Sequence, residues 1–268
     1  MKCVVGIDYR GLFERGAALL AGLAPSTCET VVVRVIEPVV SEGVPGLTPG
    51  HPVYDLTDSL VKDAESHVDE EAAKLAKSFA VSDKVVLMGD PGIELARYAD
   101  ENDADLVVVG SEQKSFLASI FLGSTTRSLA IYCPCSVLFG KSAPKSGARL
   151  VWATDLSVYN KACLRKFLSW NPSGVKEVVV VHSDVEGVPG EIEELEAFAN
   201  SFSPLGAKVS TVLSDQEPAK ALDSVLLPGD LLVVGAAGHG FMERALLGSV
   251  SFHQVVHTQH NVLVMRVP

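Results

Sequence analysis

Residues 230–265 read DLLVVGAAGHGFMERALLGSVSFHQVVHTQHNVLVM, and residues 105–140 read DLVVVGSEQKSFLASIFLGSTTRSLAIYCPCSVLFG. The two stretches align without a gap, so that Gly110 matches Gly235, Gly123 matches Gly248 and Ser124 matches Ser249. Each starts with a short Val/Leu-rich run, passes through glycines into a helix-like segment and ends on a second apolar run. The chain therefore contains two copies of one unit, and one copy predicts the fold of both.

Strand-like and helix-like runs alternate within each copy. The first copy has KCVVGI, TVVVRVI, KVVLM, DLVVVG and CSVLF, and the second has RLVWAT, EVVVVHS, AKVSTVL, DLLVVG and NVLVMRV. Short runs that are apolar almost throughout are typical of parallel strands buried on both faces. The stretches between them, such as residues 56–80, carry apolar residues at helical spacing. This alternation predicts the α/β class, with two tandem doubly wound five-stranded parallel-sheet domains, that is, Rossmann-like α/β sandwiches.

The predicted domains are residues 1–140 and 149–268. The segment GKSAPKSGA at 140–148 is small and polar, as a linker is expected to be. The first copy carries extra residues, most of which we place in the Pro/Gly-rich segment around 38–54. We expect the two domains to pack as an intrachain pseudo-dimer through their apolar last strands, because an apolar edge strand needs a cover. The sequence leaves a further homodimer open.

Composition and charge exclude several classes of function. The 268 residues are 47% hydrophobic and carry a formal net charge of −11, which argues against nucleic acid and anionic membranes as partners. The first residues do not read as a secretory signal, and no apolar run is long enough to span a membrane. The five scattered cysteines fit reduced thiols in a cytoplasmic protein. Of these, Cys133 and Cys135 resemble half a metal site, and we interpret them as ordinary thiols.

Two glycines and a Gly-Ser pair follow the fourth strand of the second copy. Gly235 and Gly238 allow backbone N–H groups to approach a ligand closely, and Gly248-Ser249 opens a helix whose first N–H groups favour phosphate. Ser249 and Ser251 add hydroxyl groups or cap the helix. In a doubly wound fold this stretch lies at the carboxyl ends of the strands, where ligands bind. The pattern therefore predicts a polyphosphate site lined by backbone.

These residues resemble the universal stress protein family, as a tandem pair covering almost the whole chain. In the nucleotide-binding branch of that family, Gly-x2-Gly-x9-Gly-[Ser/Thr] surrounds the phosphates of ATP, a first-strand Asp lies near the nucleoside, and the second strand contacts adenine. The resemblance implies that the second half binds ATP, with Mg2+ left open. The implied binding residues are Asp155, Ser183, Gly235, Gly238, Gly248, Ser249, Val250 and Ser251.

The first half departs from this pattern. Gln113 stands where the second glycine is expected, Glu112 adds a negative charge, and Arg10 replaces the small hydroxyl residue matched by Ser157. We therefore predict a weakened or lost site with an intact fold, although Arg10 is long enough to reach a phosphate. The positions that still match are Asp8, Val35, Gly110, Gly123 and Ser124.

No catalytic constellation stands out. His253, His257 and His260 have a spacing that zinc ligands use, but we interpret them as solvated histidines, because this segment contains no Asp, Glu or Cys. His182 reads as a packed residue at a strand end. The sequence thus favours an ATP-binding stress-response sensor with an unidentified protein partner. Two alternatives stay open: a nucleotide-free interaction scaffold of the same fold, and a slow ATPase.

Overall fold

The computed structural model describes residues 1–25, 27–38, 52–111, 123–144, 148–185, 191–236 and 248–267, with backbone only for 52–56. The described part is treated below as a first half (1–144) and a second half (148–267). The strands are β1 (Lys2–Ile7), β2 (Glu29–Ile36), β3 (Ala80–Met88), β4 (Leu106–Gly110), β5 (Ser136–Gly140), β6 (Ala148–Thr154), β7 (Val175–Ser183), β8 (Lys208–Ser214), β9 (Leu231–Gly235) and β10 (Asn261–Met265). The helices are α1 (Phe13–Leu23), α2 (Pro52–Leu75), α3 (Pro91–Glu101), α4 (Ser124–Tyr132), α5 (Val158–Ser169), α6 (Glu191–Asn200), α7 (Pro218–Val225) and α8 (Ser249–His257), with a short 3-10 turn at Ser203–Leu205.

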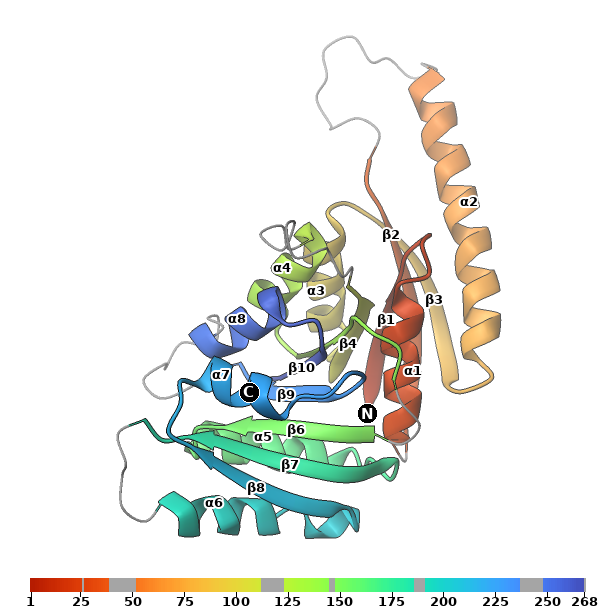
Figure 1. Ribbon diagram of the computed structural model, residues 1–268. Helices are drawn as coiled ribbons and strands as arrows, with labels where there is room; N and C mark the ends of the chain where they lie inside the picture. The colour runs from red at the N-terminus through yellow and green to blue at the C-terminus, as the bar shows by residue number, and fades with distance from the viewer. Residues whose placement is uncertain are drawn as a thin grey trace.

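All ten strands belong to one sheet in the order β3-β2-β1-β4-β5-β10-β9-β6-β7-β8. Neighbouring strands within each half are parallel, and only the central pair, β5 with β10, is antiparallel. The order reads the same from both edges once each strand is replaced by its counterpart in the other half. The predicted α/β class with five parallel strands in each half is therefore confirmed (Figure 1).

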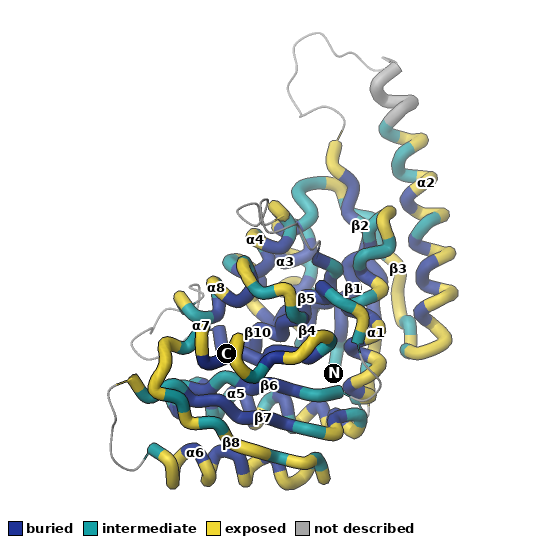
Figure 2. The backbone as a smooth tube through the Cα atoms, in the orientation of Figure 1, coloured by how far each residue is buried: buried dark blue, intermediate teal, exposed yellow. Residues whose placement is uncertain are grey.

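Helices cover both faces of the sheet. The core on one face includes residues of α1, α2, α5 and α6. The core on the other face includes residues of α3, α4, α7 and α8. The inner strands are mostly buried, whereas β3 and β8 at the two edges contain only exposed and half-buried residues (Figure 2). This explains why the inner strands read as unbroken Val/Leu runs, while the edge strands contain Lys, Ser and Asp.

The halves are joined where the last strands of each half meet. Val262 pairs with Phe139, Leu263 with Leu138 and Val264 with Val137. This is the contact that the sequence analysis expects between the apolar last strands. A second contact lies at the end of α1, where the N–H of Gly174 donates to the carbonyl of Leu23 at 3.0 Å.

Two basic residues cross this junction and cap helices of the opposite half. Lys141, just after β5, donates from Nζ to the carbonyls of Val255 (2.6 Å) and Thr258 (2.8 Å) at the end of α8. Arg266, just after β10, donates to the carbonyl of Ala130 in α4 at 2.6 Å. Cations at helix C-termini interact favourably with the helix dipole, so each half stabilises a helix of the other.

The structure corrects one predicted boundary. The helix expected over residues 56–80 ends at Leu75, and β3 already begins at Ala80, four residues before the predicted KVVLM strand. Edge strands bury little, so their apolar signal is weak and their start is hard to locate from sequence. Most of the predicted insertion (39–51) and part of the linker (145–147) lie outside the described residues. Among the described helices, none is both long and apolar enough to span a membrane.

Candidate functional site

A cavity of about 500 Å3 opens at the carboxyl ends of β6, β7 and β9, and is called here the second-half cavity. The end of β6 and the turn after it contribute Ala153, Thr154 and Asp155, and the end of β7 contributes Val181 to Ser183. The start of α8 forms another part of its wall. This is the edge of a doubly wound sheet at which ligands bind, and the volume suits a small-molecule ligand.

Asp155 lies in a tight turn between β6 and α5. The next residue, Leu156, has a left-handed backbone with φ of 59°, which is costly for a residue other than glycine. Two hydrogen bonds hold the turn: Leu156 N–H donates to Thr154 Oγ1 at 3.0 Å, and Ser157 N–H donates to Asp155 Oδ1 at 3.1 Å. The strained turn therefore fixes the half-buried carboxylate at the cavity wall.

The start of α8 presents backbone donors. Gly248 is the N-cap, and no side chain caps the helix. Ser249, Val250 and Ser251 line the cavity and occupy the first turn, whose N–H groups have no partner within a helix. The Ser251 hydroxyl is buried and donates to the carbonyl of Gly235 at 2.5 Å. Ser251 thus connects the start of α8 to the end of β9. Because its hydroxyl proton is donated to Gly235, that proton is not available to a ligand in this arrangement.

The end of β7 combines a half-buried serine with a fully partnered histidine. Ser183 donates from Oγ to the carbonyl of Gln216 at 2.5 Å. His182 is buried, with Nδ1 2.9 Å from the carbonyl of Thr154 and Nε2 2.8 Å from a carboxylate oxygen of Glu191. Both ring nitrogens of His182 are engaged, which agrees with its interpretation as a packed residue at a strand end.

The equivalent first-half cavity has a volume of about 660 Å3. Asp8 lies at the position of Asp155, but its carboxylate accepts three backbone hydrogen bonds, from Arg10 (2.9 Å), Leu12 (3.1 Å) and Phe13 (3.0 Å). These bonds hold the turn between β1 and α1. Asp155 accepts the matching bond from Ser157, so both aspartates hold the turn that follows the first strand of their half.

Gly110 has a packing role in the first half. An added Cβ at this position would lie 2.1 Å from the backbone carbon of Leu12 and 2.4 Å from the nitrogen of Phe13. The start of α1 passes so close to the end of β4 that only glycine fits. For Gly123, in contrast, the nearest atom to an added Cβ among the described residues is Thr126 Oγ1 at 4.0 Å.

The structure brings most of the sequence-predicted residues to one of the two cavities. Lining the second-half cavity are Asp155, Ser183, Gly235, Gly248, Ser249, Val250 and Ser251. Lining the first-half cavity are Asp8, Val35, Gly110 and Gly123. Ser124 is exposed and is not among the lining residues of the described part. Gly238, Glu112 and Gln113 lie outside the described residues.

Sequence reasoning did not anticipate several lining residues. Asn160 and Glu191 line the second-half cavity, and Arg34, Lys141 and the end of α8 line the first-half cavity. One signal was available: Arg34 is a basic residue inside the apolar run TVVVRVI. The contribution of α8 to a cavity of the other half follows only from the pairing of β5 with β10.

The remaining candidate ligands do not form a metal cluster. The rings of His253 and His257 lie 4.6 Å apart, but α8 ends at His257, so that His260 lies beyond the helix. Within the described ranges there is no group of three potential metal ligands. Cys133 and Cys135 are both buried and free, with their sulfur atoms 3.6 Å apart.

Comparison with known proteins agrees with this architecture. The model of the universal stress protein family matches residues 2–141. A universal stress protein of Mycobacterium tuberculosis is 29% identical over 95% of this chain and 92% of the relative. One from Methanothermobacter thermautotrophicus is 30% identical over 37% of this chain and 69% of the relative. The crystal structure of a universal stress protein from Archaeoglobus fulgidus has a TM-score of 0.74 at 17% identity, covering 99% of this chain and 98% of that one.

The fold is that of a doubly wound α/β protein with a cavity at the carboxyl ends of the strands in each parallel half-sheet. The chain belongs to the universal stress protein family. The family match covers the first half, in which the glycine motif is incomplete.

Proposed function

We propose that this chain is an ATP-binding stress-response protein, and that one nucleotide binds in the second-half cavity. The observation that carries the proposal is the arrangement of that cavity: Asp155 on one wall and the uncapped first turn of α8 on another. Backbone N–H groups at a helix start favour phosphate groups. The proposal keeps the two predicted domains, residues 1–140 and 149–268, as its structural units.

The charge of the cavity favours ATP in complex with Mg2+. Its charged lining residues among the described ones are Asp155, Asp184 and Glu191, with no Lys or Arg. Metal-free triphosphate is strongly anionic and is repelled by such a wall. A bound Mg2+ reverses this, because it neutralises phosphate charge and takes a carboxylate oxygen as a ligand. Asp155, in its fixed turn, is the carboxylate that we expect to serve the metal.

The same surroundings favour binding over turnover. His182 is the histidine among the described residues that line the cavity, and both of its ring nitrogens already have partners. The first turn of α8 contributes backbone donors and hydroxyl groups, neither of which activates water as a base. We therefore propose a sensor whose nucleotide state alters its stability or its contacts with a protein partner.

Isothermal titration calorimetry of the full chain with ATP and Mg2+ tests the proposal. We expect one site per chain with a dissociation constant around micromolar, roughly −8 kcal/mol, and weaker binding in EDTA. Asp155→Asn should weaken binding. Asp223→Asn is a matched control, because it removes the same charge from an exposed position of α7 outside the cavity. Equal effects of the two variants, or no binding to the wild type, would contradict the proposal.

A loop variant tests the glycine motif itself. Gly238→Gln copies Gln113 of the first half into the second half, and we expect it to lose ATP binding while keeping the melting temperature. Full binding by this variant would remove Gln113 as evidence against a first-half ATP site.

Multiple-turnover hydrolysis at an enzyme-like rate of about 10 per second, lost in Asp155→Asn while ATP still binds, would make the protein an ATPase.

A further inference from the structure

The two cavities differ in charge. Arg10, Arg34 and Lys141 line the first-half cavity together with Asp8 and Glu37. The second-half cavity has three acidic lining residues and no Lys or Arg in the described part of the chain. The first-half site has therefore not simply lost the features of the second. It contains three basic residues, Arg10, Arg34 and Lys141, whereas a phosphate site lined by backbone N–H groups requires none.

Asp8 does little to cancel this positive charge. Its two carboxylate oxygens together accept three backbone N–H bonds, so much of its charge is already offset within the turn. Glu37 is exposed and hydrated. Among the Asp, Glu, Lys and Arg residues that line the cavity in the described part, three are basic and two are acidic.

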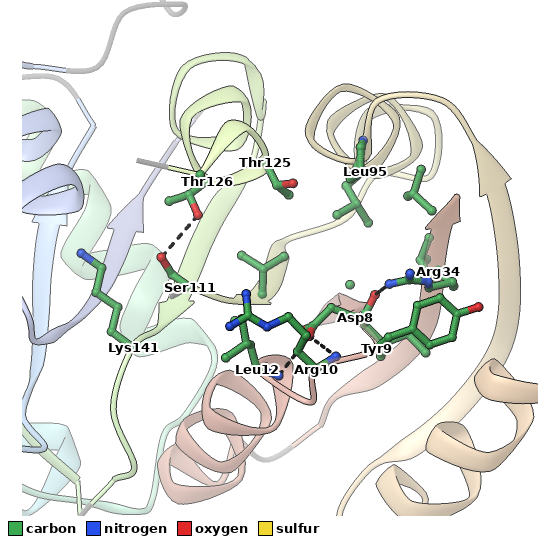
Figure 3. A pocket seen from close by; sticks show the side chains of 18 of the residues that line it. Asp8, Tyr9, Arg10, Leu12, Arg34, Leu95, Ser111, Thr125, Thr126 and Lys141 are labelled. Atoms are coloured by element: carbon green, nitrogen blue, oxygen red, sulfur yellow. Dashed lines mark hydrogen bonds between the residues drawn. The ribbon is translucent and has the colours of Figure 1, made fainter. Parts of the chain in front are cut away.

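Arg34 is held in place before any ligand arrives. Its Nη1 donates to the carbonyl of Ile7 at 3.0 Å, and its guanidinium lies 4.0 Å from the centre of the Tyr9 ring. Tyr9 in turn stacks on His67, with ring centres 4.6 Å apart. Figure 3 shows Arg34 and Tyr9 beside Asp8 at one side of the cavity. A fixed cation costs less entropy on binding than a mobile one.

Lys141 supplies a buried cation at the other side of the cavity (Figure 3). It is only 4% exposed, and within the described ranges it forms no ion pair; its Nζ donates to two carbonyls of α8. Burial lowers the pKa of this lysine to about 8. A buried ammonium without a counter-charge is stabilised by any anion that enters the same cavity.

Arg10 and the start of α4 lie between these two cations. In Figure 3 the side chain of Arg10 extends from the turn after β1 in the direction of Ser111 and Thr126. Gly123, Thr125 and Thr126 line the cavity, and α4 begins without a side-chain cap. Arginine pairs with phosphate through two parallel hydrogen bonds, and a helix start adds backbone donors.

We infer that the first-half cavity is a second ligand site, for a small phosphate-bearing anion that binds without a divalent metal. Arg10 and the start of α4 contact the phosphate, and Arg34 and Lys141 contribute positive charge from the two sides of the cavity. This site takes the place of the glycine-lined phosphate site that we predict to be weakened or lost in the first half. It is independent of ATP binding in the second half.

Calorimetry with pyrophosphate in EDTA, on the full chain, tests the inference. EDTA removes the metal on which we expect the second-half cavity to depend. We expect saturable binding of pyrophosphate with a dissociation constant below roughly 1 mM. Arg10→Ser, which installs the residue type found at Ser157, should weaken binding about tenfold or more, as for a lost hydrogen bond to a charged group.

Arg97→Ser is the matched control. Arg97 is an exposed residue of α3, paired with Glu94 and Glu101, and it does not line the cavity. Its loss changes net charge by the same amount, and binding should stay within about twofold, as for long-range charge effects screened by salt. The backbone N–H of residue 10 still bonds Asp8 in Arg10→Ser, so its melting temperature should match that of the wild type.

Two results overturn the inference: no pyrophosphate binding by the wild type, or equal weakening in Arg10→Ser and Arg97→Ser. The outcome is distinct from that of the ATP experiment. Loss of Mg2+-ATP binding with retained, Arg10-dependent pyrophosphate binding contradicts only the proposed function. Retained Mg2+-ATP binding without Arg10-dependent pyrophosphate binding contradicts only the second ligand site.

Discussion

Gly110→Ala tests whether Gly110 is required for close packing of α1 against β4. The added Cβ would lie 2.1, 2.3 and 2.4 Å from the backbone carbon and oxygen of Leu12 and the nitrogen of Phe13. These are backbone atoms of the turn that Asp8 holds through the N–H groups of Leu12 and Phe13. The start of α1 must move away from β4 by more than an ordinary side-chain adjustment, and the Asp8 hydrogen bonds must lengthen with it.

We expect the free energy of unfolding to fall by about 3 kcal/mol, the upper end of the usual cost of overpacking, because backbone and not a flexible side chain has to move. In a chain of this size that corresponds to a melting temperature lower by about 6–12 °C. Urea denaturation followed by far-UV circular dichroism measures the first quantity, and scanning calorimetry measures the second.

Gly123→Ala is the control for this prediction. Gly123 belongs to the same motif, but its φ of −57° is ordinary for any residue, and within the described ranges the nearest atom to an added Cβ is 4.0 Å away. Its replacement should cost less than about 1 kcal/mol, the range for a change at a helix N-cap. If Gly110→Ala costs under about 1 kcal/mol, or if the two variants lose equal stability, close packing does not explain Gly110.

Three further predictions concern helix ends and buried charge. Ser157→Ala should lower the free energy of unfolding by about 1 kcal/mol, seen as a lower urea midpoint, because its Oγ accepts from the N–H of Asn160 at 3.1 Å as the N-cap of α5; an unchanged midpoint contradicts this. Gly22→Ala should raise stability by about 0.5–1 kcal/mol, since an added Cβ within α1 meets no atom within 4 Å; a fall in melting temperature contradicts it. For Lys141, burial lowers the pKa in the folded chain from the usual 10.5 to about 8. The unfolded chain therefore binds more protons between these values, so wild-type stability should rise with pH there by up to about 1.4 kcal/mol per unit. Lys141→Met should show a flatter profile over the same range, and identical profiles contradict the assignment.

The repeat and its alternating elements were readable from the sequence because each depends on local pattern. Inner strands such as β1, β4 and β9 are buried on both faces and must be apolar throughout, which leaves a strong signal. The glycines at 235 and 248 could be placed from the sequence, since one ends a strand and the other precedes the next helix. Asp155 could be placed because it directly follows the apolar run of β6. The edge strand β3 was placed less well, because its residues pack little and constrain its composition weakly.

What the sequence by itself determined is the α/β class, the doubling of the unit and the residues of the glycine motif. Tertiary structure alone decided how the halves meet, because the antiparallel pairing of β5 with β10 joins segments far apart in the chain. That pairing brings Lys141 to the end of α8 and the end of α8 to a cavity of the first half. It was also tertiary structure that showed Gly110 to be a packing glycine and Asp8 a turn-forming carboxylate, because both roles depend on how closely α1 approaches β4.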